Sequence, residues 1–246
     1  MSNAPLAHHA LGRVDSTNLA ALRLLEAGEG HEGTAALPFL LTAQEQRQGR
    51  GRGGNAWASP PGNFYGTFAI AATKPDGKMA QVSFLAAVAL AHVLEGWGLR
   101  PRLKWPNDIL IQGAKVSGIL LEKHGEVLLI GMGVNLTTHP AVPGYASTSL
   151  ADEGLAIKPE ALAKPLAEAF ARWLQRWHDE GFGPVRAAWL ARAHGLGQSI
   201  GVRLMGQPAR EGRFAGLDND GALLLDGVNG LETYHAGEVY FHAAGH

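Results

Sequence analysis

The stretch Val127–Leu136 (VLLIGMGVNL) has two different faces when it is read as a β-strand. Side chains alternate across a strand, so the residues divide into two sets. Gly131, Gly133 and Asn135 share one face. Glycine weakens a strand interior, so this face indicates a surface kept clear for a ligand or for another part of the chain; close packing without a ligand is the alternative. The opposite, apolar face is suited to a core and consists of Leu128, Ile130, Met132, Val134 and Leu136.

The preceding strand is predicted at Lys115–Lys123, with His124–Glu126 as the turn. If the hairpin loop has these three residues, Lys115 lies opposite Asn135 on the glycine face. A shift of one residue in the pairing would move it relative to that face. A lysine above a glycine floor could neutralise phosphate charge, although most lysines are simply exposed.

A strand–turn–strand pattern stands before the lysine strand. Arg102–Trp105 is a candidate strand, Pro106–Asp108 is a turn, and Ile109–Gln112 leads on along the sheet. Lys104–Asp108 therefore gathers a cation, an aromatic ring, an amide and a carboxylate around one turn. By itself this segment is a good turn signal and a weak functional one.

The remaining elements of the larger, N-terminal part mix strands with helices. Capping-type residues at Asp15–Asn18 precede a helix at Leu19–Ala27, which Gly28 ends. The other predicted elements are a strand at Pro38–Ala43, an exposed loop at Thr42–Gly54, a strand at Phe64–Ala72, a buried helix at Met79–Glu95, and helices at Pro159–Glu180 and Pro184–Ala193.

After Gly195 the chain changes to short strands separated by glycine turns, which predicts a small barrel. These strands are predicted at Ser199–Met205, Arg213–Leu217, Ala222–Leu225, Glu232–His235 and Val239–Phe241. We therefore expect two domains, residues 1–195 and residues 196–246, the second of which is the barrel. The fold class predicted for the larger unit is α+β, with a mixed, mostly antiparallel sheet.

The segment Gln46–Gly54 (QRQGRGRGG) interleaves arginine with glycine. Glycine lets the backbone approach a ligand closely, and arginine supplies fork-shaped donors suited to phosphate or carboxylate. The spacing fits neither a P-loop nor the dinucleotide fingerprint. A solvated basic turn and an RNA-binding Arg-Gly segment are the alternatives.

Composition sets the broad class. The 246 residues are 46% hydrophobic and 17% charged, and the net charge of −1 argues against a general nucleic-acid-binding surface. The chain has no cysteine, which excludes disulfides and thiolate chemistry and suits a reducing compartment. No secretory signal is readable, and the longest apolar run, near Phe84–Leu94, is too short to span a bilayer. A cytoplasmic protein is the expectation.

Taken together, these residues resemble the catalytic module of biotin–protein ligases, which attach biotin to the carrier domains of carboxylases. The resemblance follows chain order over most of the sequence and implies the fold shared by class II synthetases and biotin ligases. It also implies that residues 1–195 form the catalytic domain, which binds biotin and ATP, and that residues 196–246 form an SH3-like barrel. The matching segments are Ser16-Thr17-Asn18, Gln46 with Gly49–Arg52, Trp57–Pro60, Lys104–Asp108, Lys115 with Gly118–Leu120, Gly131–Asn135 and Gly221–Leu223.

The resemblance implies two half-reactions: biotin and ATP give biotinyl-5'-AMP and pyrophosphate, and a carrier lysine then takes the biotin. Lys115 and Arg52 are the candidate catalytic residues, because they could relieve the repulsion between the biotin carboxylate and the α-phosphate. Asp108 is expected to orient or deprotonate the acceptor lysine. The candidates for binding biotin are Ser16, Thr17, Asn18, Gln46, Arg50, Gly51, Arg52, Lys115 and Gly118. The candidates for binding ATP and the adenylate are Arg50, Arg52, Trp57, Lys104, Asn107, Gly131 and Asn135.

The same resemblance suggests cofactors and partners. Mg²⁺ is expected with ATP, and no protein ligand is assigned to it. The expected partner is the biotin carboxyl carrier domain of acetyl-CoA carboxylase or a related enzyme, and a homodimer joined through a sheet edge is expected by analogy. The glycine-rich loop is expected to close over the water-sensitive adenylate.

The sequence departs from the family pattern in two places. Relatives carry a further arginine shortly before the tryptophan, where this chain has Gly53-Gly54-Asn55. Too few residues precede Ser16 for the N-terminal helix-turn-helix of some relatives, so DNA binding is not expected. The alternatives are a lipoate or octanoate ligase or transferase of the same fold, a ligase-like protein without activity, and a non-catalytic nucleic-acid-binding module.

Overall fold

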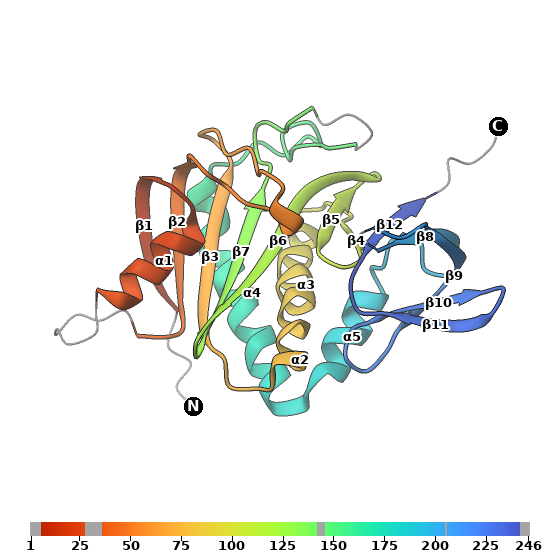
Figure 1. The fold of residues 1–246 in the computed structure, drawn as a ribbon. Helices are drawn as coiled ribbons and strands as arrows, with labels where there is room; N and C mark the ends of the chain where they lie inside the picture. Colours follow the sequence, from red (N-terminus) through yellow and green to blue (C-terminus); the bar gives the residue numbers. More distant parts are fainter. Residues whose placement is uncertain (1–5, 28–35, 142–145, 205, 242–246) are drawn as a thin grey trace.

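A seven-stranded mixed sheet forms the centre of the larger part of the molecule (Figure 1). The structure is a computed structural model and describes residues 6–27, 36–141, 146–204 and 206–241. Only β1 and β2 run parallel among the described strands of this sheet, so the predicted α+β fold with a mostly antiparallel sheet is confirmed. In order across the sheet, the strands are β1 (Ala7–Val14), β2 (Phe39–Gln46), β3 (Phe64–Ala71), β7 (Val127–Val134), β6 (Ala114–His124), β5 (Asp108–Ile111) and β4 (Arg102–Lys104).

The edge strand β1 was not predicted from the sequence. Most of its side chains are exposed, so it lacks the apolar alternation that marks a half-buried strand. The neighbouring β2 continues to Gln46, where it pairs with Val14 of β1. The predicted start of the exposed loop at Thr42 is therefore wrong, because residues 42–46, which are polar apart from Ala43, lie in a paired strand.

Helices cover both faces of the sheet (Figure 1). On one face, α1 (Thr17–Glu26) packs over β2, β3 and β7. Ser16 is its N-cap, as the sequence predicts, whereas the predicted end at Gly28 lies outside the described residues. The other face is covered by α3 (Gln81–Gly96) and α4 (Pro159–Glu180), and the short α2 (Asp76–Met79) leads into α3. Helix α5 (Phe182–Leu190) packs against α3, α4 and β9 (Arg210–Leu217) of the C-terminal sheet.

The most apolar helix is a core helix. Residues 77–96 are long and apolar enough to meet a membrane-span test, and 78% of that window is buried inside the protein. All the side chains from Gln81 to Ala91 are buried. The contacts of α3 with α4, α5 and the sheet account for its composition, so the predicted buried helix is confirmed.

The hairpin of β6 and β7 differs from the predicted register. His124 pairs with Val127, so the turn has two residues instead of three. At the other end of the hairpin, the last pair is Ser117 with Val134, and Lys115 lies beyond it. A β-bulge at Val116 in the pairing of β6 with β5 then reverses the side-chain direction. Lys115 therefore lies on the glycine face as predicted, although the predicted pairing with Asn135 is wrong.

The C-terminal strands form a second sheet that shares the hydrophobic core of the first. The five predicted strands are confirmed, and no ladder joins β11 to β12 among the described residues. Trp105 Nε1 of the larger part donates a hydrogen bond to Gly221 O over 3.1 Å, and Phe84 packs directly against Gly221. In order across this sheet, the strands are β11 (Gly230–Tyr234), β10 (Leu223–Gly227), β9 (Arg210–Leu217), β8 (Ser199–Arg203) and β12 (Glu238–Phe241).

Candidate active site

Three glycines on β6 and β7 form the floor of the candidate site. Gly118 pairs with Gly133 across the two strands. A Cβ atom on Gly133 would lie less than 3.0 Å from the indole ring of Trp57, and one on Gly131 would lie 2.7 Å from Asn18 Oδ1. The glycines of this face therefore make room for the side chains of Trp57 and Asn18, so part of the space above the sheet is used for packing within the protein.

One wall of the site is neutral and polar, and the N-terminus of α1 supplies it. Ser16, Thr17 and Asn18 are all buried. Gln46 Oε1 accepts hydrogen bonds from Thr17 N at 2.8 Å and from Thr17 Oγ1 at 3.1 Å. Ser16 Oγ accepts a hydrogen bond from Leu19 N at 3.2 Å, which is the capping role that the sequence predicts beside its binding role.

Two residues that the sequence analysis did not select support this wall. Ser59 Oγ accepts a hydrogen bond from Gln46 Nε2 and donates one to Trp57 O, and each of these bonds has a length of 2.9 Å. Asp15 accepts two hydrogen bonds from the guanidinium of Arg23, which lower the pKa of Asp15 to about 2. Ser59 thus holds the side chain of Gln46 in place, and Asp15, the residue before Ser16, is held against α1 by Arg23.

The arginine–glycine loop is held at its base and open at its tip. Trp57 N donates to Gly49 O at 2.9 Å, and Gly51 N donates to Asn55 O at 2.7 Å. Gly53 and Gly54 have φ values of +64° and +81° and face open space. Asn55 therefore closes the loop through its backbone carbonyl, and the Gly51 N–H is engaged within the loop.

A second wall of the site carries positive charge. Lys115 Nζ lies 2.6 Å from Asp108 Oδ1 and 5.4 Å from the centroid of the Trp57 ring. Arg52 Nη1 donates to Asn107 Oδ1 at 3.5 Å. Lys104, at the end of β4, stands near the same carboxylate. The three cations that the sequence predicts are thus brought together around Asp108.

Burial sets the electrostatics of this wall. Desolvation lowers the pKa of Lys104, as does the positive charge of Lys115, while Asp108 and Glu238 act in the opposite direction. Desolvation also lowers the pKa of Arg52, against the same two carboxylates. Cations that have lost part of their hydration interact more strongly with an incoming anion, so the wall is suited to phosphate.

The two asparagine candidates make structural hydrogen bonds. Asn107 lies in the turn that follows β4, and its Nδ2 donates to Ile119 O of β6. Its Oδ1 accepts the hydrogen bond from Arg52 described above. Asn135 is 2% exposed, and its Nδ2 donates to Thr148 O over 3.0 Å. Their predicted contacts with the nucleotide stay predictions.

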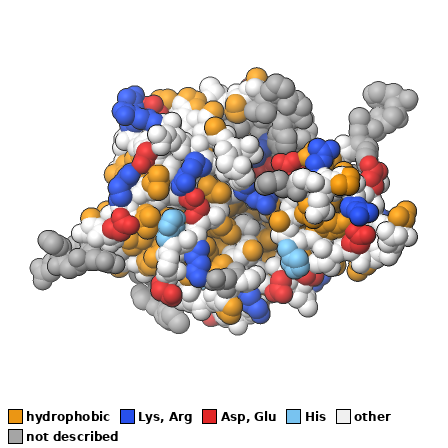
Figure 2. Space-filling view, in the orientation of Figure 1, with side chains coloured by type: hydrophobic (Ala, Val, Ile, Leu, Met, Phe, Trp, Pro, Cys, Tyr) orange, Lys and Arg blue, Asp and Glu red, His pale blue; other side chains and the backbone are white. Residues whose placement is uncertain are grey.

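The C-terminal sheet contributes to the charged wall. The charge of Glu238, at the start of β12, partly opposes the lowering of the pKa of Lys104 and of Arg52 by desolvation, and the Phe241 ring lies 5.7 Å from Lys104 Nζ. The sequence carried no signal for these residues, because only folding brings β12 beside β4. Figure 2 shows a hollow in the middle of this face, between the two parts of the molecule, with Lys and Arg side chains around it.

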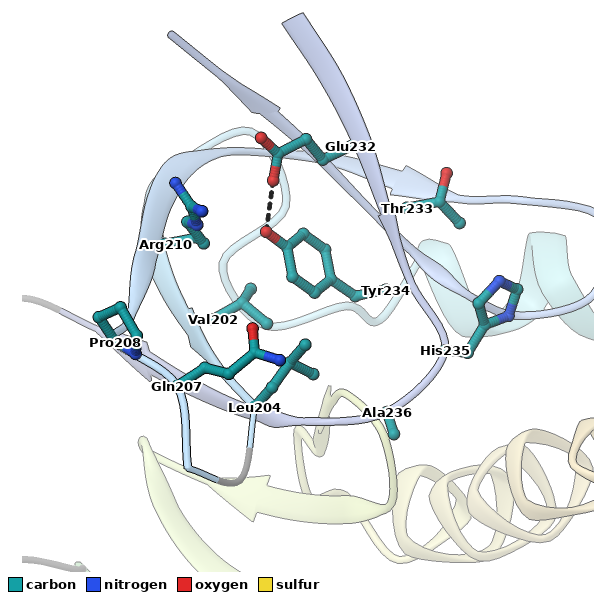
Figure 3. A pocket seen from close by; sticks show the side chains of 10 residues that line it. All are labelled: Val202, Leu204, Gln207, Pro208, Arg210, Glu232, Thr233, Tyr234, His235 and Ala236. Carbon is teal, nitrogen blue, oxygen red and sulfur yellow. Dashed lines mark hydrogen bonds between the residues drawn. The ribbon is translucent and has the colours of Figure 1, made fainter. Parts of the chain in front are cut away.

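A cavity of about 600 Å³ lies apart from these residues, within the C-terminal sheet (Figure 3). The hydroxyl of Tyr234 donates to Glu232 inside it, and burial together with Glu232 raises the pKa of Tyr234 to about 12. The cavity contains none of the predicted site residues. No group of three or more His, Asp or Glu side chains placed to hold a metal ion occurs in the described part of the chain.

The model of the biotin/lipoate A/B protein ligase family matches residues 13–137, which include most of the mixed sheet and the arginine–glycine loop. Residues 195–242 match the model of the biotin protein ligase C terminal domain. The chain therefore belongs to the biotin protein ligases.

Individual relatives agree with this assignment. A biotin–[acetyl-CoA-carboxylase] ligase of Paracoccus denitrificans is 42% identical over 94% of this chain and 99% of its own length. The bifunctional ligase/repressor BirA of Bacillus subtilis is 29% identical over 81% of this chain and 65% of its own length. The structure of a biotin protein ligase from Aquifex aeolicus in complex with biotin and ATP is similar in fold, with a TM-score of 0.80 at 23% identity, over 95% of this chain and 97% of that one.

Proposed function

We propose that this protein is an ATP-dependent ligase that forms biotinyl-5'-AMP and transfers the biotin to a lysine of a biotin carboxyl carrier domain. The observation that carries the proposal is the meeting of a neutral polar wall and a cationic wall above one glycine floor. The relative from Paracoccus denitrificans, matched over nearly its whole length, supports biotin as the acyl group.

The neutral wall fits the head group of biotin. A ureido group is uncharged but polar, so its burial requires paired donors and acceptors. Ser16, Thr17, Asn18 and Gln46 offer hydroxyl and amide groups there, and three of the four are less than 5% exposed. We assign the biotin head group to this wall.

The cationic wall fits the reacting groups. Attack of the biotin carboxylate on the α-phosphate brings two anions together, and preorganised cations lower the cost of that approach. Lys115 and Arg52 are assigned to this role, with Lys104 beside them. Trp57 and Gly118 would border the adenylate, since both lie against Lys115.

Mg²⁺ is proposed as the ion that arrives with ATP. Magnesium sites for nucleotides commonly use one or two carboxylates together with the substrate phosphates. Asp108 and Glu238 are the carboxylates that act on Lys104 and Arg52. Either could contribute one oxygen to such an ion.

Transfer requires the carrier lysine to attack as a free amine, and Asp108 is proposed to orient it. In the described structure Asp108 is paired with Lys115. If Lys115 turns to the adenylate phosphate, the carboxylate becomes available to the incoming amine. A location in the cytoplasm, a homodimer joined through a sheet edge, and the absence of DNA and membrane binding remain proposals of the same kind.

The test of this function is biotin-dependent exchange of pyrophosphate into ATP, followed by labelling of an apo carrier domain. Lys115→Ala is expected to lower the exchange rate by about 10²–10³, the usual effect of removing one charge-stabilising group. Lys164→Ala is the control, because Lys164 is an exposed lysine on α4. Exchange at the wild-type rate in Lys115→Ala would contradict the role of this residue.

A lipoate or octanoate substrate is the second candidate, because the matched family includes lipoate ligases. Parallel reactions with biotin, lipoate and octanoate, each with its own apo carrier domain, distinguish the two. Labelling with lipoate alone would overturn the choice of biotin.

A further inference from the structure

Glu122 lies on β6 at the margin of the glycine floor, and neither the sequence motifs nor the proposed chemistry uses it. It is four residues beyond Gly118, so the two-residue period of a strand places it on the same face. Its side chain is only 21% exposed, which is low for a carboxylate. A partly buried carboxylate beside a ligand site requires partners.

The partners of Glu122 come from two different parts of the site. Its Oε2 atom accepts a hydrogen bond from Asn18 Nδ2 at 2.8 Å and forms an ion pair with Arg50 Nη2 at 3.0 Å. Asn18 belongs to the neutral wall, and Arg50 belongs to the arginine–glycine loop. One oxygen atom therefore joins the loop to the wall.

The contact with Asn18 fixes which way its amide points. A carboxylate can only accept, so Nδ2 must face Glu122. At the other end of the amide, Asn18 Oδ1 accepts from Thr67 Oγ1 at 2.6 Å and lies over Gly131. The amide is thus held at both ends, with Glu122 setting its orientation.

The contact with Arg50 is a short tether of the loop. Among the described residues, the loop reaches toward the sheet through Arg50, which lies 3.0 Å from Glu122, and through Arg52, which lies 3.5 Å from Asn107. The first contact is shorter, and both of its groups are charged, which makes it the stronger of the two. A Cβ atom added at Gly53 or Gly54 would meet open space, and the backbone bonds of Gly49 and Gly51 lie within the loop itself, so the contact of Arg50 with Glu122 is a principal link from the loop to the sheet.

We propose that Glu122 is a positioning residue that couples the position of the arginine–glycine loop to the orientation of Asn18. Its part in catalysis rests on the proposed function, in which the wall binds biotin and the loop covers the adenylate. Loss of the carboxylate frees Arg50 and leaves the Asn18 amide held only by Thr67. Biotin then binds less tightly, and water reaches the adenylate before the carrier does.

The experiment compares Glu122→Ala and Glu122→Gln with Glu126→Ala, a control that removes an exposed glutamate from the same hairpin. In Glu122→Ala we expect the KM for biotin to rise about tenfold, as for loss of one charge-assisted contact, with the KM for ATP changed less than twofold. The AMP released per biotin transferred is expected to rise as well. Glu122→Gln keeps an acceptor oxygen and is expected to be intermediate.

Two further measurements separate positioning from a loss of folding. In the double variant Arg50→Ala/Glu122→Ala, the increases in loop hydrogen exchange caused by the two single changes are expected not to add, because both changes break the same ion pair. Hydrogen exchange at the backbone amides of Gly51 and Trp57 is expected to be faster in Glu122→Ala than in Glu126→Ala. Additive effects in the double variant, or unchanged amide exchange in the loop, would overturn the proposal.

The hydrogen-exchange result does not depend on catalysis. If the wild-type protein shows no biotin-dependent exchange of pyrophosphate, the proposed function fails, and loop exchange in Glu122→Ala still decides whether the tether exists. If the wild type is active and Glu122→Ala keeps its KM for biotin, the coupling fails while the function stands.

Discussion

Gly133 shows how little space separates the sheet from the loop. Its Cα hydrogen faces the indole of Trp57, and a Cβ atom there would come within 3.0 Å of Nε1 and Cε2. The same ring borders Lys115, whose Nζ atom lies 5.4 Å from its centroid. A side chain added at Gly133 would therefore push the Trp57 ring, and the ring would in turn disturb Lys115 of the cationic wall.

We expect Gly133→Ala to displace the indole and lower the rate of biotin-dependent pyrophosphate exchange at least about tenfold, as misplacement of a positioning group does. Gly12→Ala in β1 is the matched control, because a Cβ atom on Gly12 has no neighbour within 4 Å. Both variants should fold. An exchange rate in Gly133→Ala equal to that of the control would show that the indole position does not matter.

At the level of single residues, the sequence predicted the faces of β7 well, because alternation is a fixed property of a strand. The pairing of Lys115 was wrong, since the turn has two residues and the bulge at Val116 leaves no mark in the apolar pattern. Glu122 was missed, because a glutamate in a strand pattern reads as an exposed position until its partners are known.

The N-terminus of α1 combines two roles in one element. Ser16 Oγ caps the helix through Leu19 N, and the next two residues form part of the neutral wall. A cap contributes about 1 kcal/mol to stability, and an alanine there loses that contribution. Stability and ligand binding are therefore both expected to respond to a change at Ser16.

The two roles can be separated by substitution. Ser16→Ala is expected to lower the free energy of unfolding by about 1 kcal/mol and to raise the KM for biotin. Ser16→Asp keeps a good cap and should restore stability, but it places a charge beside the neutral wall and should leave the KM raised. Chemical denaturation and exchange kinetics measure the two effects, and recovery of both in Ser16→Asp would show that Ser16 acts only as a cap.

Among the elements, those with strong periodicity or clear boundaries were predicted closely. Helix α4 has the predicted bounds, and α3 differs by a few residues. The strand β1 was missed, because an edge strand with both faces largely exposed has no apolar period to detect.

The two sheets of the molecule share one hydrophobic core, although the sequence predicts two domains. Trp105 is 3% exposed and donates its indole N–H to Gly221 O across the junction. Arg186 of α5 donates to Leu217 O of β9, and Gln81 donates to Asn219 O. These contacts favour a single cooperative unit over two that unfold independently.

We expect calorimetry to show one unfolding transition, and Trp105→Phe to lower its midpoint without splitting it. The substitution leaves the buried Gly221 O without its donor, at a cost of about 1–3 kcal/mol. Trp97→Phe, a change at a partly buried tryptophan, is the control. Two separate transitions in the wild type would contradict the shared core.

At this scale the sequence could not predict the role of the C-terminal sheet in the charged wall. Glu238 and Phe241 lie more than a hundred residues from Lys104 in the chain and approach it only through packing. No local pattern encodes such a contact.

The position of Trp57 gives the protein a built-in optical reporter. The chain has six tryptophans, and the other five belong to the hydrophobic core or pack against it. The indole N–H of Trp57 has no hydrogen-bond partner among the described residues, and its ring faces Lys115 beside the site. A change in fluorescence on addition of biotin or ATP would therefore originate chiefly from this one chromophore, and titration of that emission would follow occupancy without any attached dye.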